Sequence, residues 1–129
     1  MNIKGIYTNE APKPIGAYSQ AIDANKMLFI SGQLPVNPKT GEIEVSNTAD
    51  QARLVLEHIK TILKASGLAL SDVVKSDVFL TNISDAKAVN EVYSEFFKDD
   101  PKPARVTIEV SKLPLGSKVE ISCIAAFSK

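Results

Sequence analysis

TADQARLVLEHIKTILKASGLALSDVVKSDVFLTNISDAKAVNEVYSEFFK, residues 48–98, decides the fold class, because it contains a helix, a strand and a second helix in turn. Apolar side chains at helical spacing predict the helices over residues 48–66 and 84–98. The two stripes are Ala52, Val55, Leu56, Ile59, Ile62 and Leu63, then Ala86, Val89, Asn90, Tyr93, Phe96 and Phe97. Residues 74–80 alternate apolar and polar side chains, which is typical of a strand. Together these elements predict an α+β protein.

Further strands are predicted on both sides of this stretch. They cover residues 19–22, 27–31, 105–111 and 119–127. Residues 23–26 join the first two as a hairpin, and residues 113–117 are expected to join the last two in the same way. The chain therefore has the order β-β-α-β-α-β-β in a single domain over residues 1–129, with two helices packed on one face of a mixed sheet.

The sheet face away from the helices is expected to be only half polar. The predicted pairing places Phe79 and Ile124 on this face beside Arg105 and Glu120. A one-residue slip of the hairpin would exchange the faces, so the sequence leaves open whether Arg105 and Glu120 meet within one subunit or across an interface. A single chain would leave the face in water, whereas an oligomer could bury it and build a site there. Partial solvation is also ordinary for one face of an antiparallel sheet.

Composition and charge exclude several classes of protein. Fifteen basic and fifteen acidic side chains give a net charge of zero, which lacks the electrostatic signature of a nucleic-acid binder or of a protein that binds anionic membranes. The chain shows no signal-peptide core and no apolar segment of the roughly 20 residues that span a bilayer. One cysteine forms no disulfide within the chain. A cytoplasmic globular protein is therefore expected.

Few kinds of catalytic chemistry remain. His58 is the one histidine and is expected to be a partly exposed helix residue, while Cys123 alternates with apolar residues as a core thiol would. The spacings of zinc, calcium, nucleotide and nucleophile-elbow motifs are absent, so no metal or organic cofactor is expected. General acid–base and electrostatic catalysis are left.

Arg105 is the first candidate site residue. Of the fifteen basic residues only Arg53 and Arg105 are arginine, and Arg53 lies on the solvent side of a predicted helix. Arginine binds a carboxylate through two parallel hydrogen bonds, which lysine cannot reproduce. A structural ion pair with an aspartate or glutamate explains Arg105 equally well.

Glu120 and Asn90 are polar residues in apolar surroundings. Glu120 precedes an apolar strand, where partial burial would raise its pKa and suit a general acid or base. A position at the rim of the sheet, facing water, is the alternative. Asn90 lies within a helix stripe, so it is expected to be buried and either to fasten a loop near a site or to bond the backbone.

Two shorter segments could also line a site. Gly32, in Ser31-Gly32-Gln33, would let a ligand approach the backbone, and exposed N–H groups there could bind an anion. Tyr18 could cover the mouth of a pocket. An ordinary turn and ordinary strand packing account for the same residues.

Six stretches together carry a resemblance to a known family. They are PIGAYSQA (14–21), ISGQLPVNPKTGE (30–42), ADQAR (49–53), VNEVYSEFF (89–97), PARVTIEVSKLP (103–114) and KVEISCIAAF (118–127). In order, and over nearly the whole chain, these stretches resemble the RidA/YjgF family of imine deaminases. The SGQ-x-P and PAR-x-x-x-EV-x-x-LP patterns are fairly specific in combination.

This resemblance implies a fold, an assembly and a reaction. The expected fold is chorismate-mutase-like, and the expected assembly is a homotrimer with three clefts between subunits. The implied reaction is hydrolysis of 2-aminoacrylate, 2-iminobutanoate or 2-iminopropanoate to a 2-keto acid and ammonia, without a cofactor. By position, Arg105 would hold the substrate carboxylate and Glu120 would orient or activate water. The residues matching cleft positions are Tyr18, Ser31, Gly32 and Asn90.

One position departs from the family pattern, and two other functions compete. Many members have cysteine two residues after the arginine, where this chain has Thr107, so a thiol takes no part here and the hydroxyl could hydrogen-bond. A non-enzymatic protein that binds a keto acid through Arg105 is the first alternative. A ribonuclease or translation inhibitor is the second, and zero net charge, a single histidine and few aromatic residues oppose it.

Overall fold

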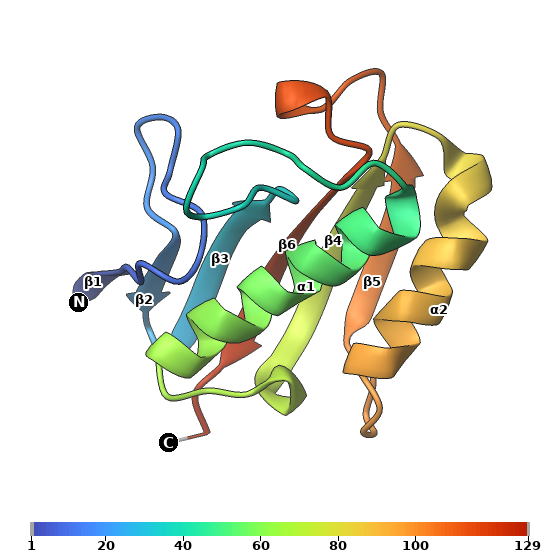
Figure 1. Cartoon of the computed structure of the whole chain (residues 1–129). Coiled ribbons are helices and arrows are strands. Elements are labelled where there is room, and N and C mark those ends of the chain that lie inside the picture. Colours follow the sequence, from blue (N-terminus) through green and yellow to red (C-terminus); the bar gives the residue numbers. More distant parts are fainter. Residues whose placement is uncertain (1, 129) are drawn as a thin grey trace.

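A computed structural model describes residues 2–128 as one six-stranded sheet with two helices on one face (Figure 1). The strands are β1 (Ile3–Ile6), β2 (Ala21–Ala24), β3 (Met27–Gln33), β4 (Val73–Leu80), β5 (Ala104–Glu109) and β6 (Val119–Ala126), and the helices are α1 (Thr48–Ala65) and α2 (Ala86–Phe96). The sheet order is β1-β2-β3-β6-β4-β5. The predicted α+β class, both helices and their common face are therefore confirmed. No helix in residues 2–128 combines the length and apolar character needed to cross a membrane.

Strand β1 was not predicted, and the predicted hairpin between the last two strands is wrong. Strand β5 pairs in parallel with β4, whereas β6 lies antiparallel between β3 and β4. The chain from β4 through α2 to β5 is a strand–helix–strand unit, the connection that parallel pairing requires. Residues 113–117 therefore cross the end of β4 and do not close a hairpin.

This pairing places Arg105 and Glu120 on opposite faces of the sheet. Arg105 is in register with the fully buried Ser76 of β4, so it lies on the helix-bearing face. Glu120 is in register with Phe79, which lies on the other face. The prediction that Arg105 and Glu120 share a face is therefore wrong, because β5 presents its apolar Val106 away from the helices.

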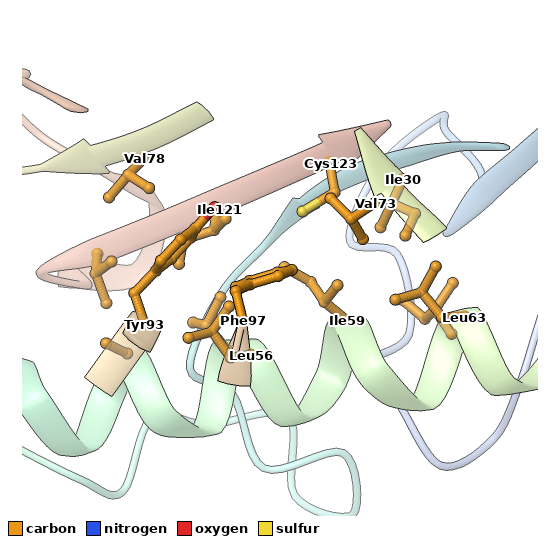
Figure 2. Packing of buried hydrophobic residues seen from close by; sticks show 14 of the residues in the cluster. Ile30, Leu56, Ile59, Leu63, Val73, Val78, Tyr93, Phe97, Ile121 and Cys123 are labelled. Atoms are coloured by element: carbon orange, nitrogen blue, oxygen red, sulfur yellow. The ribbon is translucent and has the colours of Figure 1, made fainter. Parts of the chain in front are cut away.

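The hydrophobic core fills the space between the sheet and the two helices (Figure 2). Leu56 and Ile59 of α1 pack toward Ile121 and Cys123 of β6. Cys123 is buried, and loss of solvent raises the pKa of its thiol to about 12, so it stays protonated at neutral pH. Its predicted role as a core thiol is confirmed.

His58 is buried, so the predicted partly exposed position is wrong. Its Nε2–H donates a hydrogen bond to the carbonyl oxygen of Val36 at 2.8 Å, which ties the loop after β3 to helix α1. Burial lowers the pKa of the imidazole from 6.5, because the charged form loses its hydration.

Acidification is therefore expected to destabilise the fold through His58. A depressed folded-state pKa gives stability that is present above 6.5 and is lost as the pH falls toward the folded-state value. Between pH 7 and pH 5 the free energy of unfolding should fall by up to about 1.4 kcal/mol per pH unit for this one proton. Urea titrations across this range should give a flatter profile for His58→Gln. Equal slopes for the two proteins would contradict the prediction.

Candidate functional site

Arg105 projects from the edge strand β5 toward helix α2. Its Nη1 donates a hydrogen bond of 2.9 Å to Asn90 Oδ1, and its guanidinium carbon lies 4.6 Å from the ring centroid of Tyr93. Within residues 2–128 no carboxylate oxygen lies within 4.0 Å of this guanidinium, whereas Arg53 pairs with Asp50 and Glu95. The described residues therefore do not contain the structural ion pair that was the alternative explanation of Arg105.

The surroundings of Asn90 and Tyr93 differ from the sequence prediction. Asn90 is exposed and bonds a side chain, so neither the expected burial nor the expected backbone partner is present. Tyr93, one helical turn further along, was counted only as a core residue. Its hydroxyl forms a 2.6 Å hydrogen bond with Ser76 Oγ, and burial raises its pKa. The spacing of three residues from Asn90 was the available signal that both lie beside one site.

Thr107 follows Arg105 on the same face of β5. It is in register with Val78 of β4 and is partly buried. We call Arg105, Asn90, Tyr93, Ser76 and Thr107 the arginine half-site. It carries a cation whose remaining N–H groups face solvent.

Glu120 lies on the other face, packed over Gly32. A Cβ atom built on Gly32 would come within 2.8 Å of Glu120 Cδ and closer still to Oε2, so only glycine leaves room for the carboxylate in this position. The Glu120 side chain is half-buried, and this burial raises its pKa. The absence of a side chain at Gly32 therefore makes room for Glu120 of the same chain, and not for a ligand as the sequence suggested.

Ser31 and Tyr18 are the other two predicted site residues close to Gly32. Ser31 Oγ donates a 2.6 Å hydrogen bond to the carbonyl oxygen of Ser19, which holds the irregular end of β3 against the preceding segment. Tyr18 is 47% exposed, and its hydroxyl accepts a 3.2 Å hydrogen bond from the Ile15 N–H. Tyr18 and Gly32 line the same small hollow. We call Glu120, Gly32, Ser31 and Tyr18 the carboxylate half-site.

The two half-sites do not meet within one chain, because the sheet separates them. The face that carries Glu120 also exposes apolar side chains. Phe29, Val106 and Ile108 are each more than 40% exposed there. An ion pair between Lys75 and Asp77 of β4 lies near its centre. A large groove at the ends of α1 and α2 contains no predicted site residue. In residues 2–128 no three side chains of the metal-binding types cluster.

The fold and the half-sites define a class: an α+β protein with a free arginine on one sheet face and a half-buried glutamate on the other. A family model described as Endoribonuclease L-PSP matches residues 8–127. The chain therefore belongs to this family, which is the YjgF/RidA family, and its predicted membership is confirmed.

Individual relatives match over almost the whole chain. A RutC family protein, PH0854 of Pyrococcus horikoshii, is 54% identical over 120 residues, covering 93% of this chain and 94% of that protein. TdcF of Escherichia coli, provisionally named a reactive intermediate deaminase, is 45% identical over 127 residues, with 97% and 98% covered. The solved structure of TdcF with bound serine has a TM-score of 0.90 and covers 97% of this chain and 99% of that chain. The solved structure of the Rid family protein YyfA of Yersinia pestis has a TM-score of 0.94 at 43% identity, and covers 97% of this chain and 99% of that chain.

Proposed function

We propose that this protein is a deaminase that hydrolyses short 2-imino and 2-enamino acids to 2-keto acids and ammonia, working as a homotrimer. The observation that carries the proposal is Arg105, whose guanidinium is fixed by Asn90 and Tyr93 but has no carboxylate partner in the described chain. A positioned arginine without a partner suits a carboxylate from outside the chain. The serine bound in the structure of TdcF is a ligand of the same class, a small amino acid with one carboxylate.

The proposed site forms where the arginine half-site of one subunit meets the carboxylate half-site of its neighbour. Two features support this assembly. Arg105 and Glu120 lie on opposite faces, so a substrate cannot touch both within one chain. The exposed apolar side chains on the face of Glu120 suit burial against another subunit.

The proposed mechanism uses two side chains and one water molecule. Arg105 binds the substrate carboxylate and thereby fixes the position of the imine carbon. Glu120, whose pKa is raised by burial, takes a proton from the water that attacks this carbon and passes it to the imine nitrogen, which gives a carbinolamine. Glu120 then transfers the hydroxyl proton of the carbinolamine to the nitrogen, and the carbon–nitrogen bond breaks as ammonia leaves. The carbon–nitrogen double bond is replaced by a carbon–oxygen double bond, with one water consumed and no change of oxidation state. Thr107, two residues after Arg105 on the same face of β5, would donate or accept a hydrogen bond with the substrate.

A ribonuclease function has less support. The family description names endoribonucleases, yet this chain has no net charge to attract a phosphate backbone. Its one histidine is buried, with Nε2 bonded to Val36, so it is not available for acid–base cleavage of RNA. The neutral composition and the buried, protonated Cys123 also suit the cytoplasm, where we place the reaction.

The test generates 2-aminoacrylate, 2-iminobutanoate and 2-iminopropanoate in situ, with semicarbazide present to trap the imine. The protein should lower semicarbazone formation and speed release of the keto acid, and light scattering should give the mass of three chains. If the wild-type protein changes neither rate for any of the three compounds, the deaminase proposal fails. Binding of 2-oxobutanoate by that inactive protein would then favour a carboxylate-binding regulator.

A further inference from the structure

We propose that Tyr93 is a positioning residue for Arg105, and that Ser76 holds the Tyr93 ring in the orientation this requires. The inference deepens the proposed function, since it explains how the arginine half-site is prepared for a carboxylate before any ligand arrives. The family resemblance described above implies no role for Tyr93 or Ser76.

Arg105 needs restraint because it starts from an exposed edge strand. A long, flexible side chain in water loses rotamer freedom when it binds, and that loss weakens binding. Two contacts remove the freedom in advance. The 2.9 Å bond to Asn90 Oδ1 fixes one end of the guanidinium, and the Tyr93 ring, 4.6 Å from its central carbon, restrains its plane. The plane matters, because two parallel hydrogen bonds to a carboxylate require it.

The Tyr93 ring is itself held by two contacts, with Ser76 and with Phe97. Its hydroxyl and Ser76 Oγ are 2.6 Å apart, and Ser76 on β4 has no exposed surface. The Tyr93 and Phe97 rings lie with their centroids 4.5 Å apart, and Figure 2 shows both between α2 and the sheet. The ring that contacts Arg105 is therefore part of the packed core.

The hydrogen bond between the Ser76 and Tyr93 hydroxyls serves to orient the Tyr93 ring rather than to stabilise the core. Phenylalanine and alanine would fill these two buried positions without hydroxyl groups to satisfy, and exchanging both partners is often nearly neutral for stability. The hydroxyl pair instead prevents the ring from tilting. Ser76 is also in register with Arg105 across β4 and β5, so the serine, the ring and the guanidinium form one connected support.

The first readout is the position of Arg105 itself and needs no substrate. The chain has only two arginines, so their Nε–Hε signals can be assigned in a proton–nitrogen correlation spectrum, with Arg53 as the internal reference. The Arg105 proton should be shifted upfield by the Tyr93 ring current. In Tyr93→Leu this shift should disappear. In Phe97→Leu, a matched loss of one buried ring from the same cluster, it should remain.

The second readout is the affinity for 2-oxobutanoate, measured by calorimetry. Tyr93→Leu should weaken binding about tenfold through loss of the cation–π contact and of the prearranged guanidinium, and Phe97→Leu by less than about twofold. The double variant Ser76→Ala/Tyr93→Phe keeps the ring but frees it, so binding should weaken about threefold while the unfolding midpoint stays close to that of the wild type.

Two results would overturn the inference: an Arg105 signal that is unchanged in Tyr93→Leu, or equal losses of affinity in Tyr93→Leu and Phe97→Leu. A different result would count against the proposed function alone. If the wild-type Arg105 signal is ring-shifted but 2-oxobutanoate does not bind, Tyr93 positions Arg105 as inferred, and the carboxylate assignment is what fails.

Discussion

Arg105→Ala is expected to lower kcat/KM for 2-iminobutanoate about a thousandfold while leaving the fold intact. Charge-assisted hydrogen bonds contribute about 1.5–3 kcal/mol each, and losing two of them approaches the roughly 4 kcal/mol that a thousandfold represents. Arg105 is exposed and has no ion-pair partner among residues 2–128, so the free energy of unfolding should fall only by the contribution of its contacts with Asn90 and Tyr93, no more than about 2 kcal/mol. Steady-state kinetics and urea titration of the same preparation provide both values.

Two variants isolate the chemistry of Arg105. Arg105→Lys keeps the charge but lacks the planar fork, so most of the activity should still be lost. Arg53→Ala removes the other arginine, which is exposed and pairs with Asp50 and Glu95, and it should retain wild-type kinetics. Normal activity in Arg105→Ala would exclude the proposed carboxylate contact.

Glu120→Gln is expected to lower kcat by about 10²–10⁴, the usual contribution of a general acid or base, without loss of stability. The raised folded-state pKa determines the sign of the stability change. The group stabilises the fold below its unfolded pKa, and this contribution is lost as the pH rises through the folded-state value. Above the folded-state pKa the ionised Glu120 therefore opposes folding, and glutamine should there match or exceed the wild-type stability. A variant that is both unstable and active would refute the assignment.

The packing of Gly32 against Glu120 gives an independent variant of the same experiment. Gly32→Ala keeps Glu120 itself but displaces its carboxylate, because the new Cβ would lie 2.8 Å from Glu120 Cδ. We expect a loss in kcat of about tenfold or more, since small displacements of a catalytic group are costly. Gly5→Ala on β1 is the matched control, because its Cβ would have an ordinary neighbour at 3.6 Å. If both variants had the same kcat, catalysis would not depend on the position of the Glu120 carboxylate.

Periodicity predicted the elements well, because each pattern depends on one segment alone. The stripe of α1 and the alternation from Val119 to Ala125 are buried as expected, whereas in the stripe of α2 Val89, Tyr93 and Phe97 are buried and Asn90 is exposed. Strand pairing depends on two segments, and period 2 fits either a hairpin of β5 with β6 or a parallel pair of β5 with β4. The turn-like residues 113–117 favoured the hairpin, whereas the structure pairs β5 with β4 and leaves Val106 and Ile108 each 46% exposed.

The same limit explains what was missed at the candidate site. Arg105, Glu120 and Gly32 stand out by residue type, so sequence reasoning selected them. Contacts between distant segments have no such signature. Tyr93 has the sequence pattern of any core aromatic residue, although Arg105 lies over its ring. Gly32 has the pattern of a ligand approach, although Glu120 packs against it.

The edge position of β5 has a consequence for how the arginine half-site opens and closes. Strand β5 is hydrogen-bonded to β4 alone, while β6 is bonded on both sides. Edge strands with few buried contacts separate from the native state at a lower free-energy cost than global unfolding. Detachment of β5 would carry Arg105 away from Asn90 and Tyr93 while β3, β6 and β4 stay paired. Such a local fluctuation would remove the contact that we propose between Arg105 and a substrate carboxylate. A bound ligand or an adjoining subunit that holds this edge is expected to slow amide exchange in β5 before it changes the melting temperature.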